Sequence, residues 1–165
     1  MIGYACFCVY LLILAVRDIK YKEIEDILIL IGIIISGFSY KDQLVDSALV
    51  FSSVFSFFYL GVMSINNIAY YFRLAIGYSQ NAARKIIFPL GEADMLLFGL
   101  GAIYFLGRDG NLNYNGLLEF IFISFMTFFV FNFLAILVKK TFKEIAFIPF
   151  ILIGFSISWY MNIGL

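Results

Sequence analysis

Two aspartates at the edges of apolar segments are the residues of this sequence best suited to chemistry. Asp18 follows the first apolar run, and Asp94 directly precedes the fourth. A carboxylate in or next to the hydrocarbon layer of a membrane costs free energy, so such a residue is by default a candidate for function. Two such groups are the minimum apparatus for aspartyl hydrolysis. The ionised acid takes a proton from water, and the protonated acid polarises the scissile carbonyl.

The composition excludes several other chemistries. The sequence holds no histidine, which removes histidine-based triads and the usual catalytic zinc sites. Its two cysteines, Cys6 and Cys8, lie in the first apolar run and point to different sides of a helix, so they cannot pair locally. A net charge of zero provides no basic field to attract a nucleic acid. We therefore expect no metal, no cofactor and no nucleic-acid partner.

Six apolar runs must position the two acids. The chain of 165 residues is 64% hydrophobic and 13% charged, which is too apolar for a soluble fold of this size. The runs are residues 2–16, 27–38, 44–63, 95–107, 117–138 and 145–163. We expect an all-α integral membrane protein with six transmembrane helices and no soluble domain, formed by residues 1–165 as a single unit. Pro149 is expected to kink the sixth helix.

The basic residues predict an orientation. Six spans place both termini on one face, and the 11 lysines and arginines then divide very unequally between the two faces. One face receives Arg17, Lys20, Lys22, Arg73, Arg84, Lys85, Lys139, Lys140 and Lys143, and the other receives Lys41 and Arg108. The positive-inside rule puts the richer face in the cytoplasm. We therefore expect a protein of the cytoplasmic (inner) membrane with both termini outside.

This orientation brings Asp18 and Asp94 to the same face. The first and fourth runs are too short to span unless their helices include the flanking polar residues, since a span needs about 20 residues. The first must continue through Asp18 to about Lys20. The fourth must begin near Phe88 or Pro89, and so include Glu92 and Asp94. The first helix would run from outside to the cytoplasm, with Asp18 at its cytoplasmic end. The fourth helix would start in the cytoplasm, with Asp94 near its beginning. Both carboxylates are thus expected at similar depth on the cytoplasmic side.

Three segments resemble a known family. Residues 17–24 (RDIKYKEI) are similar to the aspartate segment that ends the first core helix of type IV prepilin peptidases and archaeal preflagellin peptidases. Residues 91–94 (GEAD) resemble the GxGD motif that opens their fourth core helix, and residues 147–150 (FIPF) resemble the apolar proline segment of their last helix. The order, the spacing and the helix count agree with the family over nearly the whole chain.

The resemblance implies a membrane aspartyl endopeptidase with Asp18 and Asp94 as its catalytic pair. The implied partners are membrane lipid and pilin-like precursors, cut at a short basic leader beside a hydrophobic helix. Gly91 and Ala93 would support the motif, although Ala93 replaces its second glycine. Residues 23–26 lack the family's proline after Ile24, and residues 95–97 lack its lysine after the motif aspartate. No methyltransferase domain is recognisable, so we expect peptidase activity alone.

Other interpretations remain open at the level of sequence. The acids Glu23, Glu25, Asp26 and Glu92 could be solvated helix ends, or they could attract a basic leader. Asp18 could be an interfacial acid paired with a neighbouring base, and Asp94 could be a helix N-terminal acid favoured by the dipole. The alternative functions are a small transporter or channel that uses the two acids as a cation site, and a non-catalytic scaffold subunit of a pilus or secretion machine. The sequence leaves the substrate, the oligomeric state and the source undetermined.

Overall fold

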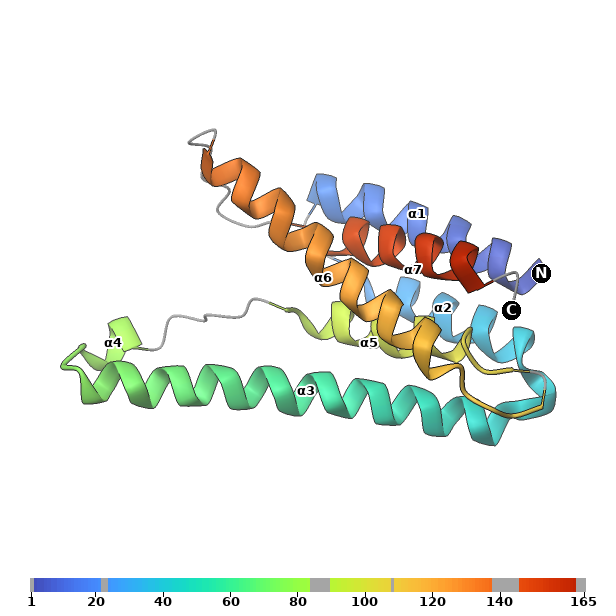
Figure 1. The fold of residues 1–165 in the computed structure, drawn as a ribbon, viewed down its shortest axis with the longest axis horizontal. Helices are drawn as coiled ribbons and strands as arrows, with labels where there is room; N and C mark the ends of the chain where they lie inside the picture. The colour runs from blue at the N-terminus through green and yellow to red at the C-terminus, as the bar shows by residue number, and fades with distance from the viewer. Residues whose placement is uncertain (1, 22–23, 84–89, 108, 138–145, 163–165) are drawn as a thin grey trace.

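The protein is a bundle of helices (Figure 1). The computed structural model describes residues 2–21, 24–83, 90–107, 109–137 and 146–162. Its helices are α1 (Ile2–Tyr21), α2 (Asp26–Ser39), the short 3-10 helix η1 (Lys41–Gln43), α3 (Leu44–Ala75), α4 (Gln80–Ala83), α5 (Glu92–Ile103), α6 (Tyr114–Leu137) and α7 (Ile148–Asn162). Within these ranges the β-structure consists of one isolated antiparallel bridge, between Leu106 and Leu112.

Of the two helices that carry the acids, α1 has the expected length and α5 is shorter than expected. Residues 90 and 91 are not helical, so α5 does not begin near residue 88 as the length of a span requires. The first helix, α1, runs past Asp18 to Tyr21, and α5 begins at Glu92 so that Asp94 lies in its first turn. The third helix differs from expectation, because α3 continues to Ala75 instead of ending near residue 63. Hydropathy marks where a chain would leave lipid, whereas the helical backbone continues through polar residues as long as its own hydrogen bonds are satisfied.

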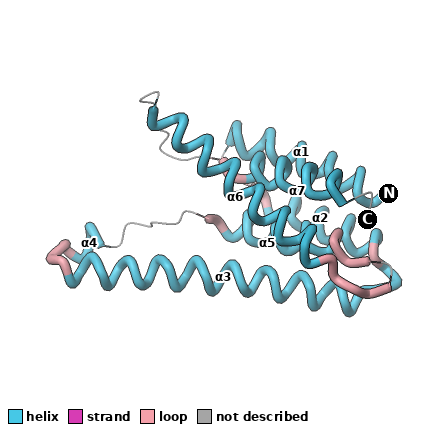
Figure 2. The backbone as a smooth tube through the Cα atoms, viewed as in Figure 1, coloured by secondary structure: helices cyan, strands magenta, loops and turns pink. Residues whose placement is uncertain are grey.

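The long helices alternate in direction, so alternate connections gather at the same end (Figures 1 and 2). The pairing of α1 with α7 is antiparallel: the backbone of Ile148 at the start of α7 contacts Asp18 near the end of α1, and Trp159 near the end of α7 stacks on Tyr4. Consequently, the ends of α1 and α3 and the beginnings of α2, α5 and α7 face one side of the bundle. The beginning of α1 and the end of α7 lie at the opposite side.

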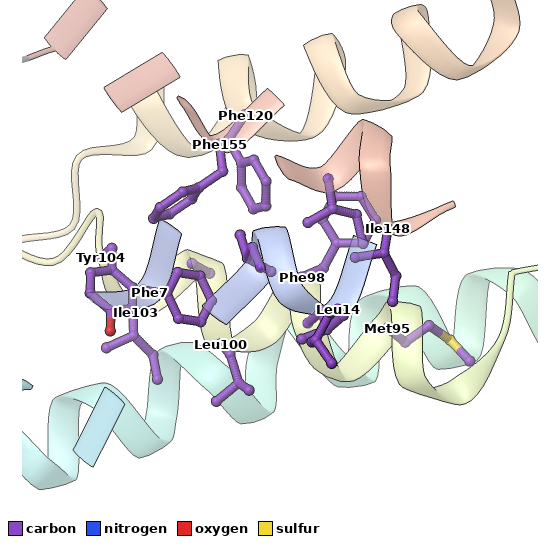
Figure 3. Packing of buried hydrophobic residues seen from close by; sticks show 14 of the residues in the cluster. Phe7, Leu14, Met95, Phe98, Leu100, Ile103, Tyr104, Phe120, Ile148 and Phe155 are labelled. Carbon is purple, nitrogen blue, oxygen red and sulfur yellow. The ribbon is translucent and has the colours of Figure 1, made fainter. Parts of the chain in front are cut away.

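An aromatic core holds α1, α5, α6 and α7 together (Figure 3). Phe7, Phe98, Phe120 and Phe155 are completely buried, and Phe98, Phe120 and Phe155 come from three different helices. The Phe120 ring packs edge-on against Phe155, with 5.6 Å between centroids, and lies 5.3 Å from the Phe98 ring. Lipid tails are as apolar as these rings, so in a membrane the rings hold the helices together through van der Waals packing.

Close helix contacts occur at glycines. A Cβ added at Gly99 would lie 2.8 Å from the Phe51 ring, and one at Gly101 would lie 2.9 Å from the Phe120 ring. A Cβ at Gly32 would lie 2.4 Å from the Tyr10 hydroxyl. These positions allow neighbouring helices to approach, as small residues do in membrane bundles.

Two of the described helices are long and apolar enough to cross a membrane, namely residues 41–75 and 114–134. An integral membrane protein is therefore consistent with the fold. Three further apolar helices are shorter: α2, α5 and α7 have 14, 12 and 15 residues. At 1.5 Å per residue they extend only about 18–23 Å, against about 30 Å for a hydrocarbon core.

The expectation that Pro149 kinks the sixth helix is wrong. The preceding residues Ala146 and Phe147 are not helical, and α7 begins at Ile148, so Pro149 lies in the first turn. The N–H groups of a first turn have no partner within their helix, so proline loses no hydrogen bond there, and its fixed φ suits the helix start. Pro149 therefore marks a helix start.

Candidate active site

Asp18 is a buried acid that binds the beginning of another helix. Its side chain lies in the last turn of α1 and is 9% exposed. The backbone N–H of Ile148, the first residue of α7, donates a hydrogen bond of 3.1 Å to Asp18 Oδ2. Because the first N–H groups of a helix have no partner within it, this carboxylate satisfies a donor that would otherwise be buried and unpaired. Asp18 therefore joins α1 to α7 at this end of the bundle.

Asp94 has a similar place at the start of α5. It is half-buried, three residues into the helix after the N-cap Gly91. The Gly91 N–H donates a hydrogen bond of 3.0 Å to Asp94 Oδ2. This is the reaching-back half of a capping box, in which the third helical residue fixes the chain that enters the helix. Asp94 is thus an acid at a helix N-terminus, as one interpretation of the sequence predicted. This position is compatible with a catalytic role as well.

The fold brings these two carboxylates within electrostatic reach. They are far apart in the sequence, yet Asp18 binds Ile148 of α7, and the neighbouring Phe147 ring lies 5.9 Å from that of Phe98, one helical turn after Asp94. In Figure 3, Leu14, Met95 and Ile148 lie at one end of the buried cluster. Leu14 is one helical turn before Asp18, Met95 follows Asp94, and Ile148 donates to Asp18. The same packed layer thus positions both acids.

Each acid uses its Oδ2 to accept a backbone N–H at the beginning of a short helix. Helix N-termini carry a partial positive charge, which stabilises negative charge nearby. The arrangement holds both carboxylates in fixed orientations without a basic side chain in either of these two bonds. Two fixed carboxylates in one partly desolvated place can share one proton, because ionising both is unfavourable.

Gly91 leaves space beside the Asp94 carboxylate. A Cβ there would lie 3.4 Å from Asp94 Oδ2, an ordinary contact distance, and the backbone has φ of −76°, which any residue adopts. Glycine is therefore not demanded by the backbone at this position. Its neighbour Ala93 is half-buried and packs against the core. Both motif residues thus lie next to Asp94, with Gly91 on the exposed side.

The other predicted acids lie on the surface of the same end. Glu25 is exposed and forms an ion pair with Arg17, so Arg17 has a partner other than its neighbour Asp18. Asp26 and Glu92 are exposed in the first turns of α2 and α5. Glu23 lies outside the described residues, as do Lys22, Arg84, Lys85, Arg108, Lys139, Lys140 and Lys143 of the charge count.

Sequence reasoning missed the Ile148 N–H as a partner of Asp18. A signal for it existed, because proline one residue after Ile148 is typical of a helix start, where N–H groups need acceptors. Within the described ranges, no group of three or more histidine, cysteine or acidic residues could hold a metal ion. Comparison with protein-family models, curated proteins and solved structures gives no match.

Proposed function

We propose that this protein is a membrane aspartyl endopeptidase in which Asp18 and Asp94 act together. The observation that supports this most is their convergence: two acids from α1 and α5, each oriented by a backbone N–H, lie at one end of the bundle within electrostatic reach. The resemblance of residues 17–24 and 91–94 to prepilin and preflagellin peptidases points to the same pair.

The chemistry requires only these two groups and a water molecule. The ionised aspartate takes a proton from the water, and the water oxygen attacks the peptide carbonyl carbon. The protonated aspartate donates its proton to the carbonyl oxygen, which gives a neutral tetrahedral intermediate. The acid that took the proton from water then protonates the amide nitrogen, while the other acid takes a proton from one hydroxyl of the intermediate. The C–N bond breaks to give a carboxylic acid and an amine, and the two aspartates again share one proton. No cofactor takes part.

The proposed substrates are pilin-like or archaellin-like precursors with a basic leader and a hydrophobic helix. Asp26 and Glu92 are exposed at the end where the catalytic pair lies, and their charge would attract a basic leader. The space beside Gly91 gives the peptide bond room to approach Asp94.

Helix α3 offers an apolar flank for the hydrophobic part of such a substrate. Phe58 stacks on Phe98 at 4.6 Å, and α3 and α5 are antiparallel, so Asp94 is level with about Val62. From there α3 continues to Ala75, roughly 20 Å further at 1.5 Å per residue. This projecting part carries exposed Met63, Ile68 and Phe72.

The proposed topology has six spans with both termini outside. The alternating directions of the long helices and the unequal distribution of basic residues support it. The shorter helices α5 and α7 would then begin below the cytoplasmic surface. The acids would lie in a recess that water reaches from the cytoplasm, as hydrolysis within a membrane requires.

The test is cleavage of a synthetic precursor that has a basic leader followed by a hydrophobic helix. The precursor is co-expressed with the wild-type chain, Asp18→Asn, Asp94→Asn or the double variant, and cleavage is scored by size. Each single variant should lose nearly all activity, and the double variant should be little worse, because residues that act as a unit are strongly non-additive. Asp46→Asn is the matched control, because Asp46 is an exposed acid at the opposite end of the bundle, and it should keep wild-type activity.

Robust cleavage by either asparagine variant would refute the aspartyl mechanism. If the variants instead abolished a proton or cation flux in liposomes, the transporter interpretation would replace it. If neither cleavage nor flux occurred in the wild type, the scaffold interpretation would gain support.

A further inference from the structure

A cavity of about 500 Å³ lies at the end of the bundle opposite to the aspartates. Its wall includes Tyr4 of α1, Tyr40 after α2, Tyr104 after α5 and Trp159 of α7. Tyr4 is 14 residues before Asp18, which places the cavity about 21 Å away along α1. The peptidase mechanism makes no use of these residues.

The aromatic wall is held in place before any ligand binds. Tyr4 stacks on Trp159 with 3.7 Å between centroids, and on Phe155 at 4.8 Å. Tyr104 stacks on Phe7 at 4.5 Å and meets Tyr40 edge-on at 5.4 Å. Rings that are already packed lose little conformational freedom when a ligand binds, so more of the contact energy appears as affinity.

The charge of the cavity wall is negative. Among the described residues that line it, Asp42 is the charged one, and the remainder are aromatic, polar or aliphatic. Burial, with a contribution from Tyr104, raises the pKa of Tyr40 to about 12, so this phenol is neutral near pH 7. Asp42 is exposed on η1 beside Gln43, so its carboxylate is accessible to a ligand that enters the cavity.

From these features we infer that the cavity binds an alkylammonium group, such as a quaternary ammonium ion. Aromatic rings attract such cations through the negative potential of their faces, and tryptophan does so most strongly. The carboxylate adds a Coulomb attraction, and the half-apolar wall suits the carbon atoms around the nitrogen. An anion would meet repulsion from Asp42, and a simple metal ion would find one carboxylate instead of the several oxygens it prefers.

Two sources could supply this group, a lipid headgroup or a water-soluble amine. The cavity lies at the end of the helices, where tyrosine and tryptophan commonly meet the headgroup layer of a membrane. The chemistry of recognition is the same in both cases, so the experiment contains one arm for each source.

Trp159 provides a direct signal, because it is the single tryptophan of the sequence. The full chain in non-ionic detergent is titrated with tetramethylammonium chloride or choline chloride, and tryptophan emission is recorded. Sodium chloride at equal ionic strength is the reference. We expect a saturable change with both ammonium salts and none with sodium chloride. The same response from sodium chloride, or no response to either ammonium salt, would overturn the inference.

Variants then separate the contributions of charge and ring. Asp42→Asn should raise the half-saturating concentration about fivefold, because it removes the attraction between one exposed carboxylate and the bound cation. Asp46→Asn is the matched control, because Asp46 is an exposed acid one helical turn away that does not line this cavity. Tyr40→Phe should bind as the wild type does, and Tyr40→Leu should bind several-fold more weakly. The inference would be contradicted if Asp42→Asn bound the ammonium salts as tightly as the wild type. Thermal unfolding curves establish that the variant is folded.

The lipid arm uses nanodiscs of phosphatidylcholine, phosphatidylethanolamine or phosphatidylglycerol. If the headgroup amine is the ligand, choline salts should change Trp159 emission in phosphatidylglycerol but not in the amine lipids. A response in all three would identify a water-soluble amine instead. Asp18→Asn should give the same titration as the wild type, so this test stands or fails independently of the proposed peptidase.

Discussion

Replacement of Asp18 by alanine should destabilise the fold, whereas replacement by asparagine should not. The Ile148 N–H that donates to Asp18 Oδ2 is buried, so alanine leaves it without an acceptor. A buried unsatisfied N–H costs about 1–3 kcal/mol. The amide oxygen of asparagine can accept the same hydrogen bond, and the loss of a buried charge removes a desolvation cost. The free energy of unfolding should then change by less than about 1 kcal/mol for asparagine.

Asp94 gives a useful comparison because its hydrogen bond is at the surface. The Gly91 N–H that donates to Asp94 is exposed, so water can replace the carboxylate there. Asp94→Ala should therefore cost only about 0.5–1 kcal/mol, in the lower range for the loss of a helix cap. Asp26→Ala removes an exposed acid at the same end of the bundle and should change stability by less than about 0.5 kcal/mol.

The assay combines unfolding in detergent with the initial rate of leader-peptide cleavage in liposomes. Stability should fall in the order Asp26→Ala, Asp94→Ala, Asp18→Ala, with the last the least stable. Activity should follow another order, since Asp18→Asn should be as inactive as Asp18→Ala although it is folded. An Asp18→Asn variant that unfolds as readily as Asp18→Ala would refute the hydrogen-bond argument. One that is stable and active would refute the catalytic assignment.

Three further predictions follow from the packing, the charges and the composition. Gly154→Ala should destabilise the fold by about 1–3 kcal/mol or prevent folding, because its Cβ would lie 2.8 Å from the α6 backbone. Gly61→Ala is the control in the same unfolding assay and should be neutral or stabilising, because a Cβ there has no neighbour within 4 Å. Cysteine labelling at Lys41 should report the exterior and at Lys140 the cytoplasm, and the reverse pattern would break the proposed topology. Mass spectrometry of a product made by the purified chain alone should show an unmethylated N-terminus, and a methylated one would contradict the expectation of peptidase activity only.

The prediction for helix α3 shows where reasoning from hydropathy is limited. The apolar run suggested an end near Met63, but the helix continues through Asn66 to Ala75. Polar residues interrupt an apolar pattern without interrupting a helix, since the backbone hydrogen bonds do not depend on side-chain polarity. For α5 the argument from span length succeeded only in part. The helix includes Asp94, but it begins at Glu92 instead of near residue 88, and its 12 residues are too few to span.

The sequence by itself determined the helical class, the apolar character and the location of Asp18 and Asp94 at helix ends. These are local properties, set by composition and by the length of each apolar run. Only the tertiary structure decided that the Ile148 N–H binds Asp18, that Pro149 begins a helix, and that the two acids come within electrostatic reach. Those relations join residues far apart in the chain, and they depend on how α1, α5 and α7 pack around a shared aromatic core. The alternation of apolar and polar residues along one helix carries no record of that packing.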